Sequence, residues 1–135
     1  MTFSEGQTVY VPAYSHIQSA YSGDKGSQIT LAVTLSVRNT DIDEAIIVNS
    51  VKYYGNDGGF IKEFVETPLQ LGPMGSMDFY IDRLDLSGGI GANFIVDWGA
   101  EKEVHEPYIE AIMIGAQGTL GYSWRNPGQV LDKKE

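Results

Sequence analysis

Apolar and polar side chains alternate most regularly between Gln28 and Asn39. A period of two over about ten residues, rich in β-branched side chains, indicates a β-strand with one face in the core and the other facing water or small side chains. The apolar positions are Ile29, Leu31, Val33, Leu35 and Val37. The pattern therefore predicts one long strand over this segment.

Shorter segments repeat the alternation at intervals of roughly ten residues, which is the spacing of all-β sandwiches and barrels. β-Branched and aromatic residues are enriched in them, as they are in strands generally. The segments are Val9–Val11, Ile46–Tyr54, Met77–Ile81, Phe94–Trp98 and Tyr108–Ile114. Together with the long strand and the weaker segments they predict about eight strands.

Turn-forming residues separate these segments, because glycine tolerates positive φ and proline fixes the backbone. Tyr54–Phe60 is a strong signal for a tight hairpin. The other breaks are 22–27, 71–75, 87–91 and 125–128. No window has helical periodicity with a capping residue, so we expect at most one short helical turn, near Asp82–Leu86.

These elements predict an all-β fold, an immunoglobulin-like antiparallel β-sandwich of about eight short strands, rather than a barrel. The chain has 135 residues, which is the size of one domain with an ordinary core. No internal repeat or linker divides it. We expect a single domain over residues 1–135, with an ordered core over about 7–130 and a frayed tail over 131–135.

Charge narrows the classes of partner. Lys and Arg number 9 against 18 Asp and Glu, a net charge of −9, which disfavours nucleic acid and anionic membrane surfaces. There is no cysteine, which excludes disulfides and thiolate chemistry. No apolar stretch is long enough for a transmembrane segment or signal peptide, so we expect membrane association only through a partner or a removed leader.

Two groups of residues are candidate ligand sites. Asp41, Asp43 and Glu44 can supply oxygen ligands to Ca²⁺, but the EF-hand loop pattern is absent and solvated acidic loops are the favoured interpretation. A glycine-rich loop runs from Ser87 to Asn93, but a strand pattern follows it, so it lacks the helix N-terminus that phosphate-binding loops use. We therefore predict no metal and no cofactor.

The two histidines, His16 and His105, lie in segments that we expect to be loops. Ser15 precedes His16 directly, and in a strand the two side chains would point to opposite faces, which argues against a nucleophilic pair. The segment from Arg38 to Asp41 favours Asx-turn geometry, and Arg38 can pair with Asp97 or Glu110 on a neighbouring strand. No catalytic residue is predicted.

Tyrosine and tryptophan are more numerous than a small core needs. On an exposed face they anchor protein partners or stack on sugar rings, whereas at the edge of a core they only fill space. They are Tyr10, Tyr14, Tyr21, Tyr53, Tyr54, Tyr80, Tyr108, Tyr122, Trp98 and Trp124. The sequence does not select the members of an interaction surface.

Four segments together resemble a known family: residues 6–16, 35–41, 87–98 and 110–115. In order and spacing they are similar to the bacterial domain of unknown function 3124, and the likeness extends from Gly6 to about Val130. The resemblance implies a small single-domain bacterial protein, often with an export signal or a lipid-anchoring cysteine ahead of the domain, and hence a periplasmic or cell-envelope location. It brings no catalytic residues.

The favoured hypothesis is a non-catalytic binding module, an accessory subunit that contacts another protein through a sheet edge, turns and exposed aromatics. One alternative is a carbohydrate-binding module, and another is a metal-assisted hydrolase that uses His16 or His105 with Asp41 or Asp97. The partner and the oligomeric state stay open. The interaction candidates are Ser15, His16, Ser87, Gly88, Gly89, Gly91 and Asn93, supported structurally by Arg38, Asn39 and Asp41.

Overall fold

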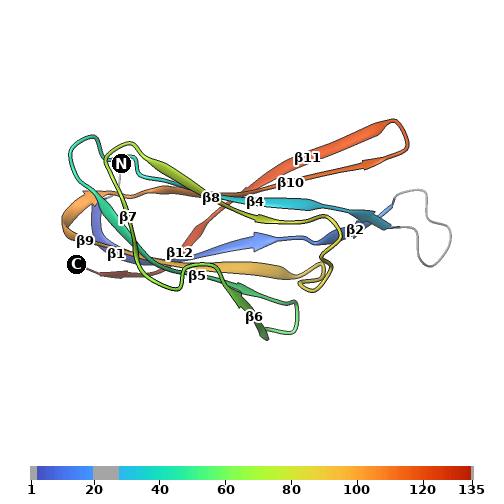
Figure 1. Cartoon of the computed structure of the whole chain (residues 1–135), viewed down its shortest axis with the longest axis horizontal. Helices are drawn as coiled ribbons and strands as arrows, with labels where there is room; N and C mark the ends of the chain where they lie inside the picture. Colours follow the sequence, from blue (N-terminus) through green and yellow to red (C-terminus); the bar gives the residue numbers. More distant parts are fainter. Residues whose placement is uncertain (1–2, 20–27, 135) are drawn as a thin grey trace.

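The fold consists of two antiparallel β-sheets that face each other, as the computed structural model shows for residues 3–19 and 28–134 (Figure 1). There is no helix in these residues. The strands are β1 (Phe3–Ala13), β2 (His16–Gln18), β3 (Gln28–Thr30), β4 (Ala32–Arg38), β5 (Ile46–Tyr54), β6 (Phe60–Glu63), β7 (Leu69–Leu71), β8 (Ser76–Ile81), β9 (Ala92–His105), β10 (Tyr108–Gln117), β11 (Leu120–Pro127) and β12 (Gln129–Lys134).

The larger sheet has the order β12-β1-β9-β5, and β6 and β7 both pair with the remaining side of β5. The smaller sheet has the order β11-β10-β4-β8. A separate short ladder joins β2 and β3. Figure 1 shows the two main sheets as stacked layers, so the predicted all-β sandwich is confirmed.

The core lies between the sheets, where the alternating apolar faces meet. Trp98, Phe94 and Leu35 are fully buried there, as the period-two patterns of their strands predict. The register places Phe94 opposite both Val11 and Tyr53, so one continuous apolar row crosses β1, β9 and β5. The predicted strand Ile46–Tyr54 has those bounds in the structure, and the predicted hairpin after it joins β5 to β6.

The number of strands differs from the prediction. The described residues form twelve strands where we expected about eight, partly because the segment after Gln28 is interrupted at Leu31, whose N–H donates to the carbonyl oxygen of Ser15 at 3.0 Å. At Asp82–Leu86, where we expected at most a short helical turn, the N–H of Asp85 donates to the carbonyl oxygen of Asp82 at 2.9 Å, and the Asp82 side chain accepts the N–H of Leu84 as in an Asx turn. The break at 22–27 lies outside the described residues.

The predicted frayed tail is also wrong as far as Lys134. Residues 129–134 form β12, which pairs antiparallel with β1 in the register Gly6 to Lys134. The hydroxyl of Ser4 donates to the carbonyl oxygen of Lys134 at 3.0 Å. The polar side chains of β12 are exposed, so the backbone ladder rather than apolar burial holds this strand.

Gly128 carries the chain from one sheet to the other, because β11 belongs to the smaller sheet and β12 to the larger. Its N–H donates to the carbonyl oxygen of Ile109 at 2.8 Å. A Cβ at this position would lie 2.6 Å from Cγ1 of Val9 and 3.2 Å from that carbonyl oxygen. The crossing therefore closes one side of the sandwich and requires a residue without a side chain.

We predict that Gly128→Ala lowers the free energy of unfolding by about 1–3 kcal/mol, because the methyl group overpacks against the stiff, buried Val9. Urea denaturation monitored by tryptophan fluorescence measures this loss. Gly121→Ala is the matched control on β11, since a Cβ there meets no atom within 4 Å. Equal stability of the two variants would contradict the tight crossing.

Candidate functional site

The glycine-rich loop lies at one end of the sandwich, beside Ser15 and the β5–β6 hairpin. The N–H of Ser15 donates to the carbonyl oxygen of Gly89 at 3.0 Å, and the N–H of Asn56 donates to that of Gly88 at 2.9 Å. A Cβ at Gly91 would lie 2.8 Å from Cβ of Asn56. The structure thus brings the predicted interaction residues Ser15, Gly88, Gly89 and Gly91 together, while Ser87 is exposed and Asn93 lies on β9 opposite Pro12 and Tyr54.

Tyr53 explains why this loop needs glycine. Its hydroxyl is buried, has no hydrogen-bond partner among residues 3–19 and 28–134, and would overlap a Cβ at Gly88. Burial, with a smaller contribution from the negative charge of Asp85, raises the pKa of Tyr53 to about 12. The loop packs onto the neutral phenol of Tyr53, and this close packing stabilises the fold.

Ser15 and His16 differ from the prediction. The Ser15 hydroxyl lies 2.9 Å from Nδ1 of His16, because Ser15 lies in a bend before β2 and the two side chains are not forced to opposite faces. Both histidines end up in strands, His16 in β2 and His105 at the end of β9. Ser15 is fully buried, so its hydroxyl cannot meet a substrate at the surface.

The acidic loop after β4 lies at the opposite end of the sandwich. Asp41 accepts the N–H groups of Asp43 and Glu44 on Oδ1, at 2.9 Å each, and that of His105 on Oδ2 at 3.0 Å. These backbone donors, His105 first, hold the pKa of Asp41 below its ordinary value of 3.8. Asn39 accepts the N–H of Asp41, which confirms the predicted Asx turn. The carboxylate of Asp41 is therefore used within the fold.

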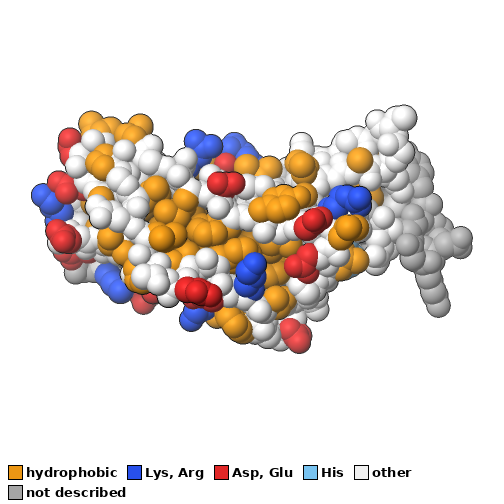
Figure 2. All heavy atoms as spheres, in the orientation of Figure 1, with side chains coloured by type: hydrophobic (Ala, Val, Ile, Leu, Met, Phe, Trp, Pro, Cys, Tyr) orange, Lys and Arg blue, Asp and Glu red, His pale blue; other side chains and the backbone are white. Residues whose placement is uncertain are grey.

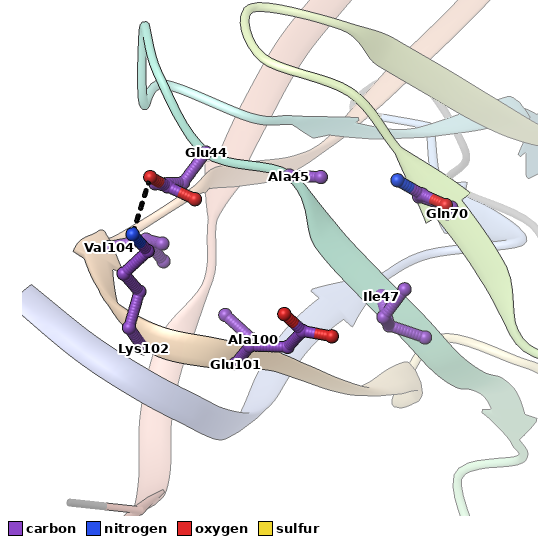
Figure 3. A pocket seen from close by; sticks show the side chains of 8 residues that line it. All are labelled: Glu44, Ala45, Ile47, Gln70, Ala100, Glu101, Lys102 and Val104. Atoms are coloured by element: carbon purple, nitrogen blue, oxygen red, sulfur yellow. Dashed lines mark ion pairs between the residues drawn. The ribbon is translucent and has the colours of Figure 1, made fainter.

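No group of three or more acidic or histidine side chains in residues 3–19 and 28–134 is arranged to hold a metal ion. Glu44, one of the predicted calcium candidates, instead forms an ion pair with Lys102 at 3.0 Å. Figure 3 shows this pair beside a hollow of about 160 Å³, with Gln70 and Glu101 also at its wall. The pair neutralises two of the charges there and leaves the carboxylate of Glu101 at the wall.

The histidines lie at opposite ends of the domain. His16 is near the start of β9, since Ala13 pairs with Ala92, and His105 ends that strand opposite Phe3, about 33 Å away at the rise of extended β1. Asp97 is opposite Thr8, about 16 Å from His105 on the same basis. The proposed hydrolase groups therefore do not converge on one cleft, except that His105 contacts Asp41 through its backbone.

The aromatic residues do not form one row. Trp98 and Tyr53 are buried, and Trp124 packs edge-on against Tyr14 at 6.0 Å. Tyr80 and Tyr108 are exposed on different strands, β8 and β10. Tyr21 lies outside the described residues. This scatter does not favour the planar platform of a carbohydrate-binding module.

Tyr108 instead takes part in a polar cluster on the outer face of the smaller sheet. Its hydroxyl donates to Oε1 of Glu110 at 3.0 Å, and Nη1 of Arg125 lies 3.4 Å from the same oxygen. The ion-pair partner of Glu110 is therefore Arg125 on β11 rather than the predicted Arg38. Asp97 is on the other sheet.

The apolar core reaches the surface on the side opposite the Gly128 crossing. Here β8 is the last strand of the smaller sheet, and β6 and β7 are the last strands of the larger one. Phe64, in the connection between β6 and β7, spans the gap, with its ring 5.7 Å from that of Phe79 and 6.1 Å from that of Phe94. Figure 2 shows the resulting band of hydrophobic side chains between the sheets.

We call this band the open side and define it by four residues. Met77 and Phe79 face inward from β8, opposite buried Val37 and Leu35, and both are partly exposed. Leu69 on β7 faces inward opposite Val48 and is 44% exposed. Phe64 completes the set. Because no strand of the described residues covers these inward faces, part of their apolar surface meets solvent.

The backbone of β8 also points toward the open side. The N–H of Asn39 donates to the carbonyl oxygen of Gly75 at 2.8 Å, which makes that pair a hydrogen-bonded one. Hydrogen-bonded pairs occur at every second position of an antiparallel ladder, so Met77, Phe79 and Ile81 bond to β4. The backbone groups of the residues between them, Asp78 and Tyr80, therefore point away from β4, toward an edge without a pairing strand in the described part of the chain.

Comparison with known proteins places the chain in a family. A family model described as "Protein of unknown function (DUF3124)" matches residues 6–131. The chain belongs to this family. No curated protein matches it significantly.

One solved structure, "Crystal Structure of Thermotoga maritima 1070", is similar to this DUF3124 protein with a TM-score of 0.54. The alignment covers 95% of this chain and 97% of that chain, at 11% sequence identity. A likeness at this identity concerns the fold alone. In the described residues of the DUF3124 protein, no helix is long and apolar enough to cross a membrane.

Sequence reasoning missed the open side of the DUF3124 protein. The alternation of Met77, Asp78, Phe79 and Tyr80 identifies a strand and its inward face, but it does not reveal that the strand lies at an edge. The polar or exposed residues at every second position of β8 give no signal either, because strands inside the sheets, such as β5, alternate in the same way.

We predict that Asp41→Asn weakens the acid dependence of stability. Because the folded-state pKa of Asp41 lies below 3.8, its contribution is fully present above that pH and is lost as pH falls from 3.8 toward the lower folded value. The variant should be less stable at neutral pH and lose less on acidification, as urea titrations from pH 7 to pH 2 will show. Asp43→Asn, which changes an exposed carboxylate in the same loop, should retain the wild-type profile.

We also predict an alternating amide exchange pattern along β8. The N–H groups of Asp78 and Tyr80 should exchange with solvent rapidly, whereas those of Met77 and Phe79 should be protected by their bonds to β4. Hydrogen–deuterium exchange followed by NMR measures each amide. Equal protection of all four would contradict the free edge.

Proposed function

We propose that this protein is a non-catalytic binding module that receives an extended segment of a partner protein along the open side. The single observation that supports this function is the coincidence of two features on β8: unpaired backbone groups at the edge and exposed apolar side chains beside them. A strand added to a sheet edge gains affinity from main-chain hydrogen bonds and specificity from alternate side chains. The open side supplies both.

The geometry of the open side fits a strand better than a small molecule. The hollow beside Phe64, with a volume of about 420 Å³, is shallow and lined by consecutive residues 62 to 67, from the end of β6 and the connection after it, together with Leu69. Enclosed pockets with convergent polar groups are typical of small-molecule sites. An edge strand of six residues is instead close to the usual length of a pairing strand.

Location in the cell envelope is part of the same proposal. It rests on the family resemblance, which implies export or lipid anchoring ahead of the domain. The glycine-rich loop and the acidic loop then serve as structural ends of the scaffold, while the open side makes the contact.

The function is tested by substituting an outward-facing amide of β8. Tyr80→Pro removes one N–H that points toward the open side and leaves the ladder to β4 in place, since proline is tolerated on edge strands. We predict that a partner recovered stoichiometrically from the envelope fraction with the wild-type protein is lost with Tyr80→Pro. Tyr80→Phe, which keeps the backbone N–H and the ring, should still recover it.

Thermal melting establishes that the proline variant is folded. Should it be unfolded, exchange of the Asp78 and Tyr80 amides in the wild-type complex replaces it: the partner should slow both amides. Recovery of the same partner by folded Tyr80→Pro, or unchanged exchange at both amides, would show that the contact lies elsewhere.

A further inference from the structure

Asp78 occupies the centre of the free edge. Its side chain is exposed on the outer face of the smaller sheet, opposite Ser36 of β4. It forms no hydrogen bond or ion pair with residues 3–19 and 28–134. Arg38 on β4 is opposite Ser76 and is therefore the diagonal neighbour of Asp78. Arg38 and Asp78 form no ion pair. The edge strand therefore carries a carboxylate that makes no ion pair in the described residues, beside backbone groups that point away from β4.

A strand that pairs with β8 must place one residue directly opposite Asp78 on the same outer face. Opposite charges at such cross-strand positions stabilise the pairing and like charges destabilise it. The alternate residues of the same strand point inward, toward Met77 and Phe79 and across to Leu69 and Phe64. These positions favour apolar side chains.

Charged side chains of both signs surround the edge. The chain leaves β8 through Asp82 and Asp85, with Arg83 between them, and Glu66 and Lys62 are exposed on the other rim of the open side. Lys62 lies 4.5 Å from the centre of the Phe64 ring. Figure 2 shows acidic and basic side chains on both sides of the hydrophobic band. Since this rim has no strong field of its own, the position of Asp78 on the edge and the net charge of −9 are what favour a basic segment over an acidic one.

We propose that the occupant of the open side is an extended segment of a partner protein that has apolar side chains at alternate positions and a lysine or arginine opposite Asp78. This inference rests on the proposed function and specifies the chemistry of the partner. A second copy of this chain is a weaker candidate, because each copy carries a net charge of −9. An antiparallel β8 pair centred on Asp78 would also set the two carboxylates against each other.

The test uses synthetic peptides with blocked ends, titrated into the whole protein and followed by NMR. The first alternates valine with threonine and has one central lysine at an outward position. The second has glutamate in place of that lysine. The third has the composition of the first, but its valines are consecutive, so that its apolar residues do not share one face.

We expect the lysine peptide to shift and protect the Asp78 and Tyr80 amides, and the glutamate peptide to bind about five-fold more weakly. Asp78→Lys should reverse this preference. Asp43→Lys, which reverses an exposed charge in the acidic loop at one end of the sandwich, should leave the preference intact. The rearranged peptide should not bind at β8.

Each contrary result identifies what fails. If both alternating peptides bind wild type and Asp78→Lys equally, strand addition stands and the charge specificity is overturned. If no alternating peptide binds, or the rearranged one binds as well, the proposed function itself is overturned. If sedimentation shows a dimer that Tyr80→Pro dissociates and the lysine peptide does not displace, the occupant is a second copy and the inference is wrong.

Discussion

The fold depends on one constraint: the apolar face of each sheet must be buried against the other sheet. A sandwich has two sides along which these inward faces can become exposed to solvent. On one side the chain itself passes between the sheets at Gly128, with the N–H of that residue bonded to Ile109. On the other side the chain crosses between the sheets at residues 72–75, beside Asn39 at the end of the sandwich, and the Phe64 ring spans the gap farther along. The exposed apolar band follows from this asymmetry, because Met77, Phe79 and Leu69 have inward neighbours but no closing strand.

Polar groups at the two ends of the sandwich stabilise the frame around this gap. Asp41 binds three backbone N–H groups at one end, and the loop around Gly88 packs on Tyr53 at the other. Asp41 and the glycine-rich loop, which the sequence offers as candidate ligand sites, thus form turns and close packing contacts. Their engagement fixes the positions of β4 and β5, on which the edges β8, β6 and β7 depend. A contact surface on such edges is held by rigid elements.

The sequence predicted the core strands well because burial on one face imposes a period of two, as in Phe94, Val96 and Trp98. It failed where long-range backbone bonds decide the structure. Nothing in the side chains of Asp132 and Lys133 indicates a strand, yet β12 forms by pairing with β1. The bend that joins Ser15 to His16 likewise depends on contacts with distant segments. Whether a strand lies inside a sheet or at its edge is a property of topology, so the open side could not be predicted.

An acidic residue on an edge strand has two physical consequences that act together. A charge on an edge discourages pairing with identical strands, which is how many proteins avoid aggregation. In a chain with a net charge of −9, long-range repulsion between copies already opposes that pairing. Asp78 adds a short-range charge at one register position, where it distinguishes among incoming strands by the side chain opposite it. The same carboxylate that disfavours pairing with a second copy therefore favours pairing with a basic segment. Burial of the partly exposed Met77 and Phe79 adds to the free energy of that binding.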